Sequence, residues 1–168
     1  MSTSNNTLAF IALSNEFCSA IENANQTERH DFVDAMTRLL PRIYITAIDI
    51  PEPSLLDNGD VYVNDVLDED YYDSMRRNIE TVLGEDDSYL EVFEEDMKYS
   101  DTPIGASISE GLADIFQVLY NYLETVRESP TELIEPITGA VREDFANYWS
   151  QKVCNVLRAI NSIKFANQ

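Results

Sequence analysis

The hydrophobic pattern along residues 103–127 predicts one long amphipathic α-helix. Its apolar residues recur every three or four positions, which at about 100° per residue places them on one stripe. The stripe consists of Ile108, Leu112, Ile115, Leu119, Leu123 and Val126. Ser107 and Glu110 form the Ser-x-x-Glu pattern of a capping box, and Ser129-Pro130 predicts the end of the helix. A single apolar stripe needs other helices to cover it, so we expect this helix at the centre of the fold.

Four more segments have the same helical spacing, and they cover about residues 7–24, 28–48, 69–83 and 137–163. Thr27 is a candidate N-cap for the second helix. Pro41 inside that helix predicts a kink, or two helices end to end, because proline removes a backbone hydrogen bond. Gly84 suits the left-handed residue that ends the third helix. The pattern therefore predicts one all-α domain over residues 1–168, a mostly antiparallel bundle of about five main helices.

Acidic residues are concentrated in the middle of the chain. The net charge is −20, and residues 52–101 hold 17 acids against three bases, whereas residues 127–168 have no net charge. We expect residues 51–66 to form a long loop. Residues 85–101 contain an aromatic island, Tyr89, Leu90, Val92 and Phe93, and are expected as a short helix or an extended cover on the bundle.

This charge restricts the partners that the protein could bind. A strongly negative field repels nucleic acid and anionic membranes, which are bound chiefly through Lys and Arg, and it favours a basic protein or cations. Glu94, Glu95, Asp96 and Asp114 are candidate contacts for such a partner, although the same residues also suit a solvated surface. On the last helix, Tyr148 and Trp149 could line a ligand groove or pack in the core.

The sequence offers no candidate catalytic, cofactor or metal site. It contains one histidine, His30, and two cysteines, Cys18 and Cys154, whose spacing matches no metal motif. We expect an exposed His30 in the first turn of its helix and two packed cysteines. A glycine-rich phosphate loop is absent, and residues 57–61 lack the ligands of a calcium loop. These features favour a protein that is not an enzyme and needs no cofactor.

The N-terminal segment predicts a cytoplasmic protein. MSTSNNTLAF has no basic region before its apolar residues, and the apolar run is soon interrupted by polar residues, so we expect no signal peptide. No stretch approaches the roughly 20 apolar residues that a membrane span needs. We therefore expect reduced thiols and no membrane contact.

Two stretches in the second half of the chain carry a family resemblance. One is Tyr89-Leu-Glu-Val-Phe93 followed by Ser107-Ile-Ser-Glu-Gly-Leu-Ala-Asp-Ile115, and the other is Phe145-Ala-Asn-Tyr-Trp149 followed by Leu157-Arg-Ala-Ile-Asn-Ser162. Their order and spacing resemble a bacterial family of small, acidic, helical proteins, the domain of unknown function numbered five thousand and sixty-three. Ser150 and Asn161 stand where that family often has Gly and His. The resemblance implies an all-α domain with no established activity.

Three classes of function remain open. The first is a non-catalytic interaction or adaptor protein that presents an acidic face to a basic partner. The second is an inhibitor or immunity-type protein, including a mimic of nucleic-acid charge. The third is a small-molecule binder or enzyme with a pocket between its helices. The sequence does not determine the oligomeric state.

Overall fold

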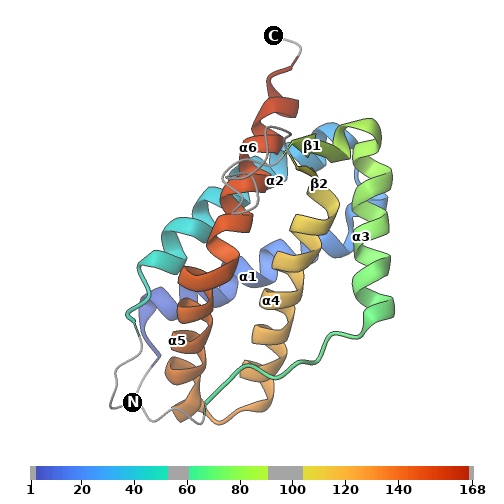
Figure 1. Cartoon of the computed structure of the whole chain (residues 1–168). Helices are drawn as coiled ribbons and strands as arrows, with labels where there is room; N and C mark the ends of the chain where they lie inside the picture. Colours follow the sequence, from blue (N-terminus) through green and yellow to red (C-terminus); the bar gives the residue numbers. More distant parts are fainter. Residues whose placement is uncertain (1–2, 53–60, 91–103, 167–168) are drawn as a thin grey trace.

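The computed structural model describes residues 3–52, 61–90 and 104–166, and shows a helical domain (Figure 1). The α-helices are α1 (Asn5–Glu22), α2 (Arg29–Ile48), α3 (Glu69–Leu83), α4 (Ile108–Glu128), α5 (Ile134–Asp144) and α6 (Ser150–Lys164). Short turns of 3-10 helix are η1 (Ala24–Gln26), η2 (Gly84–Asp87) and η4 (Thr131–Leu133), and η5 (Phe145–Trp149) is a π-helical turn. Two short strands, β1 (Ser88–Leu90) and β2 (Gly105–Ser107), pair antiparallel.

Helix α4 lies at the centre, as its stripe predicts. It packs against α1, α3, α5 and α6, and both α3 and α6 run antiparallel to it (Figure 1). Ile108, Leu112, Ile115 and Leu119 are fully buried. Towards the end of α4 the stripe becomes only partly buried. The predicted set of about five main helices is confirmed when α5, η5 and α6 are taken as one continuous C-terminal run.

Local sequence signals place several helix ends correctly. Helix α3 spans 69–83, as predicted, and the Asp68 carboxylate accepts a hydrogen bond of 2.7 Å from the backbone N–H of Tyr71. Gly84 follows it with a φ of 59°, a left-handed conformation that favours glycine. The Ser107 hydroxyl caps α4 by accepting from the backbone N–H of Glu110 at 3.2 Å, the first half of the predicted capping box.

One prediction about α2 is wrong, and one of the two alternatives for Pro41 is excluded. Thr27 is not its N-cap, because its hydroxyl donates to the carbonyl of Asn23 and closes η1, and Glu28 takes the N-cap position. Pro41 does not divide the segment into two helices, since α2 runs without a break from Arg29 to Ile48. Leu40 and Ile43, on either side of Pro41, are both fully buried. Their packing compensates for the one hydrogen bond that proline removes.

The C-terminal run differs from the single regular helix predicted over 137–163. Between α5 and α6 the five residues of η5 form a π-helical turn. The Trp149 ring packs edge-on against Phe145 with centroids 4.5 Å apart, and its Nε1–H donates to the Val141 carbonyl at 3.3 Å. A π turn adds a residue to the helical repeat, which changes the direction of the side chains that follow. Sequence spacing alone carries no signal for it.

Some sequence-based predictions lie outside the described residues, and others are settled. Most of the loop expected over residues 51–66, and the candidate contacts Glu94, Glu95 and Asp96 of the expected cover, lie outside the described residues, which omit 53–60 and 91–103. The predicted exposure of His30 is confirmed. Cys18 is buried, and burial raises its thiol pKa. The prediction that Cys154 is packed is wrong, because it is exposed on α6.

Gly111 permits the close approach of α4 and α6. A Cβ at this position would clash with Cγ1 of Val156, and valine has little rotamer freedom to move away. We expect Gly111→Ala to lower the free energy of unfolding by about 1–3 kcal/mol. In a Val156→Ala background the added Cβ has space, so the same substitution should cost less. Denaturant melts of the two single variants and the double variant measure this coupling, and strict additivity would contradict it.

Tyr122 makes stability depend on pH in the alkaline range. Its side chain is fully buried beside Phe10, its hydroxyl hydrogen bonds with that of Thr138 at 2.7 Å, and burial raises its pKa to about 12. An unfolded tyrosine titrates near pH 10, so this contribution is complete below pH 10 and is lost as the pH rises towards 12.

We therefore expect the free energy of unfolding to fall by about 2–3 kcal/mol over that interval through Tyr122 alone. Denaturant melts between pH 9 and pH 11.5 check this. The fall should be shallower in Tyr122→Phe, which keeps the ring, and unchanged in Tyr62→Phe, which alters a tyrosine that is 70% exposed. Identical pH slopes for wild type and Tyr122→Phe would contradict the assignment.

Candidate functional site

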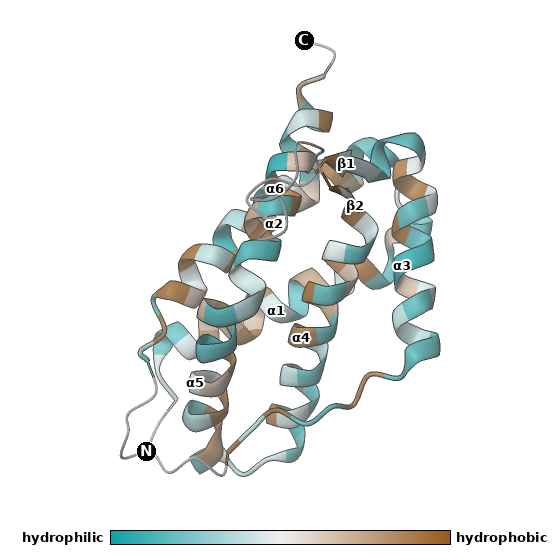
Figure 2. Ribbon diagram, viewed as in Figure 1, coloured by the Kyte–Doolittle hydropathy of each residue, from teal (hydrophilic) through white to brown (hydrophobic). Residues whose placement is uncertain are grey.

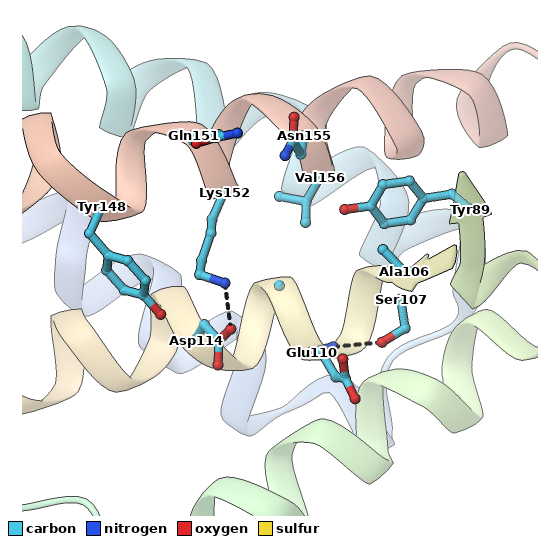
Figure 3. Close-up of a pocket in the computed structure, with 11 residues that line it drawn as sticks. Tyr89, Ala106, Ser107, Glu110, Asp114, Tyr148, Gln151, Lys152, Asn155 and Val156 are labelled. Carbon is cyan, nitrogen blue, oxygen red and sulfur yellow. Dashed lines mark hydrogen bonds and ion pairs between the residues drawn. The ribbon is translucent and has the colours of Figure 1, made fainter. Parts of the chain in front are cut away.

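A polar furrow runs between α4 and the η5–α6 segment, and it contains two adjoining pockets. The first has a volume of about 290 Å³ (Figure 3). Its walls combine a lysine, two acids, two amides and two tyrosines above a small apolar floor: Lys152, Glu110, Asp114, Gln151, Asn155, Tyr89, Tyr148, Ser107, Ala106, Gly111 and Val156. The second pocket shares Asp114 and Tyr148 with the first and has a volume of about 340 Å³.

One end of the first pocket depends on a buried aspartate in η2. The Asp87 side chain accepts 2.7 Å hydrogen bonds from both the backbone N–H and the hydroxyl of Ser109. A carboxylate beside the first N–H groups of a helix is also favoured by the helix dipole. This contact fixes β1 over the start of α4, and β1 carries Tyr89 to the pocket wall beside Ala106 (Figure 3).

Asp114 lies at the centre of the furrow, and both of its carboxylate oxygens have partners within the protein. Its carboxylate accepts from the Tyr72 hydroxyl at 2.6 Å and forms an ion pair with the Lys152 ammonium at 2.9 Å. Burial raises the pKa of Tyr72, and so does its hydrogen bond to Asp114. Burial lowers the pKa of Lys152, but the hydrogen bond to Asp114, the negative charge of Asp114 and the neighbouring Tyr148 together outweigh this and leave that pKa above its usual value.

These pKa shifts decide what the network can do at neutral pH. Lys152 is a cation and Tyr72 is a neutral phenol, so neither group is a general base. The furrow offers charge, hydrogen bonds and aromatic surface, which are the means of binding. Within the described ranges, no group of three or more His, Cys, Asp or Glu residues is placed to hold a metal ion.

The two aromatic candidates on the C-terminal run have different roles. Tyr148 is 52% exposed, lines both pockets, and lies beside the Lys152 ammonium, which is 5.2 Å from its ring centroid. Trp149 is fully buried in the core. Of the two alternatives drawn from the sequence, Trp149 takes the core position, whereas a ligand groove at Tyr148 stays a prediction.

The second pocket is closed on one side by the extended segment before α3. Asn121 holds this segment through its side-chain oxygen, which accepts from the backbone N–H groups of Val66 and Leu67 at 3.0 and 2.8 Å. The Thr125 hydroxyl accepts from the backbone of Asn64 at 3.0 Å. Asp144, on the opposite wall, has a raised pKa because of burial and the nearby charge of Glu143.

Sequence patterns miss most of this furrow. Asn121 lies off the apolar stripe of α4, yet it is only 8% exposed and accepts from two backbone N–H groups. Thr125 is likewise buried. Polar residues close to an apolar stripe are the only signal in the sequence, and they do not identify which backbone will reach them. Asp114 is a candidate partner contact by sequence, but the structure shows an internal partner for each of its oxygens.

The fold and the furrow together define a small α-helical domain with a polar furrow between its central and C-terminal helices. The chain belongs to the family described as Domain of unknown function (DUF5063), which it matches over residues 1–166. A similar solved structure is the crystal structure of protein BF1032 from Bacteroides fragilis, with 28% sequence identity and a TM-score of 0.83. That match covers 98% of this chain and 96% of the other. No protein of curated function gives a significant match.

The helices of the described part of the chain fall short of what a bilayer requires. None of them combines the length and the apolar character needed to cross a membrane.

The role of Asp87 is open to direct measurement. Asp87→Ala removes the carboxylate that accepts from the N–H and hydroxyl of Ser109 in a buried site, so we expect the free energy of unfolding to fall by about 1–3 kcal/mol. Glu85→Ala, in the same turn but exposed, is the matched control and should change stability by less than about 0.5 kcal/mol. Equal effects of the two variants in denaturant melts would rule out this clamp.

Proposed function

We propose that this protein is a non-catalytic interaction protein that binds a basic partner through an acidic face centred on α3. The acidic face is defined by exposed residues of the described part of the chain, Asp65, Asp68, Glu69, Asp70, Glu80 and Glu85. Residues 61–90 contain nine acids and two arginines, a net charge of −7. Figure 2 shows hydrophilic residues over much of α3 between its hydrophobic bands.

The observation that carries this proposal is that both arginines of α3 pair with acids of the same helix. Arg76 hydrogen bonds to Asp73 at 3.0 Å and to Glu80 at 2.8 Å, and Arg77 lies 3.5 Å from Asp73. Both cations are therefore engaged within the helix, while its first turn keeps Glu69 and Asp70 exposed. Like charges placed together on a folded surface repel each other, and a basic partner would relieve this repulsion.

The acids that the sequence suggests as partner contacts do not contribute equally to this surface. The Asp114 carboxylate already binds Tyr72 and Lys152, so its charge is largely taken up inside the protein and is less available to a partner. Glu94, Glu95 and Asp96 lie outside the described residues and remain proposed contacts on sequence grounds. Their charge has the same sign as that of the acidic face, so they too would favour a basic partner.

Two other functions remain alternatives. An inhibitor or immunity-type protein would use the same acidic face, and it differs only in that its partner is a toxin or a nucleic-acid-binding protein. A small-molecule binder would use the first pocket, whose polar lining includes Tyr148, Asn155 and Lys152 (Figure 3). A volume of about 290 Å³ lies at the lower limit of ordinary ligand pockets, so only a small polar molecule would fit.

The experiment measures binding of a fluorescent decalysine peptide at low and moderate salt. The test variant combines Glu69→Gln, Asp70→Asn and Glu85→Gln on the acidic face. The control combines Glu128→Gln, Glu132→Gln and Glu143→Gln, three exposed acids on other elements, and has the same net charge. We expect the test variant to lose about tenfold or more in affinity and the control about threefold or less, with wild-type binding weakening steeply as salt rises.

Melting temperatures of both variants show whether the fold is intact. Glu69 and Asp70 lie in the first turn of α3, where each favours the helix by about 0.3–1 kcal/mol, so a small loss of stability is expected in the test variant. Equal loss of affinity in the two variants would mean that the peptide senses only overall charge, and the acidic face would then be a solubility feature.

A further inference from the structure

The surface groove between α2 and α6 has a chemistry unlike the rest of this acidic protein. It is larger than the two furrow pockets, at about 650 Å³. Its apolar lining includes Pro41, Leu157 and Phe165, and Phe165 is 48% exposed. The described residues that line the groove come from α2, from α6 and from Phe165 just after α6, and none of them belongs to α3. We call it the α2–α6 groove.

Cations surround this apolar lining. Arg38, Arg158 and Lys164 line the groove together with a single acid, Asp34. The groove residues therefore carry a net charge of +2 in a chain whose net charge is −20. The lining also differs from that of the two furrow pockets, where acids outnumber bases.

The cations are only partly neutralised. Asp34 accepts from Arg38 at 3.1 Å and from Lys164 at 3.0 Å, so one carboxylate serves two cations, and these hydrogen bonds lower its pKa. Arg158 donates to the backbone carbonyl of Leu90 at 2.7 Å. Within the described ranges no carboxylate forms an ion pair with Arg158. Its guanidinium has further N–H donors for an incoming carboxylate.

We infer that the α2–α6 groove binds an acidic amphipathic helix of a partner protein. The helix would place apolar side chains on Pro41, Leu157 and Phe165, and carboxylates beside Arg158 and Lys164. A groove between two helices is a recurring site for an amphipathic helix, with affinity from apolar contact and selectivity from charge at the rim.

The charge and apolar lining of the groove favour an acidic amphipathic helix over a second copy of the chain or a small anion. A second copy of the chain would bring another net charge of −20, whose repulsion acts against self-association. A small anion would use the cations but leave the apolar lining exposed to water. This surface goes beyond the acidic face, because it lies on different helices and selects a partner of opposite charge. The two surfaces together would let one small domain join a basic protein to an acidic one.

The probe is a fluorescein-labelled 18-residue peptide of Glu, Leu and Ala, with Leu at helical spacing, and binding is followed by anisotropy. The test variant is Arg158→Gln with Lys164→Gln. The control is Arg42→Gln with Arg127→Gln, two exposed arginines on other surfaces that give the same charge change. We expect the test variant to lose about tenfold or more in affinity, roughly two charge contacts, and the control about threefold or less.

Two further measurements test the apolar part. Phe165→Ser removes an exposed ring and should weaken binding of the peptide without changing the fold. Cys154 lines the groove and is exposed, whereas Cys18 is buried, so a bulky maleimide should react quickly at Cys154 and block the peptide. A peptide with Gln in place of Glu, or Ser in place of Leu, should bind much more weakly.

Three results would overturn the inference. Equal losses in the test and control variants would show that only overall charge matters. Slow reaction of Cys154 in the folded, peptide-free protein would show that the groove is already covered by the chain itself. A dimer in sedimentation that Phe165→Ser dissociates would show that a second copy is the occupant. Because none of these variants alters α3, a failure here leaves the proposal for the acidic face intact.

Discussion

The structure depends on covering α4 on all its apolar sides. The helix is too hydrophobic to remain exposed along Leu112, Ile115 and Leu119, and α1, α3, α5 and α6 surround it. The contact with α6 is close at Gly111, because glycine has no side chain to hold the helix away from Val156. Local helix propensity cannot replace the free energy gained by burying this apolar stripe, since most helical stability in proteins comes from packing an apolar face.

The same arrangement creates the polar furrow. At the boundaries between the helices that cover α4, polar side chains of α4 lie buried or partly buried between two neighbouring elements. Asp114 holds Tyr72 of α3 and Lys152 of α6, and so joins three helices through one carboxylate. Asn121 and Thr125 act in the same way on the extended segment before α3. Buried polar groups need partners, and here the partners come from the elements that cover the helix.

Charge is separated across the domain. Acids gather on α3 and the segment before it, whereas the α2–α6 groove collects cations around an apolar lining. The arginines of α3 pair with acids of the same helix, and because the acids outnumber them, α3 keeps a net negative charge. In the groove one aspartate serves two cations, so a net positive charge persists there. The family has no described function, so the two proposed surfaces rest on the distribution of charged and apolar residues alone.

The sequence by itself determined the all-α class, the central position of α4 and the limits of α3, because periodic apolar spacing and caps act within a few residues of the chain. Tertiary structure alone decided the continuity of α2 through Pro41, the π turn at 145–149, the burial of Asn121 and the exposure of Cys154. It also decided which side chains meet in the furrow and the α2–α6 groove. These features depend on contacts between residues far apart in the chain, and their energies outweigh the local preferences that a sequence pattern records.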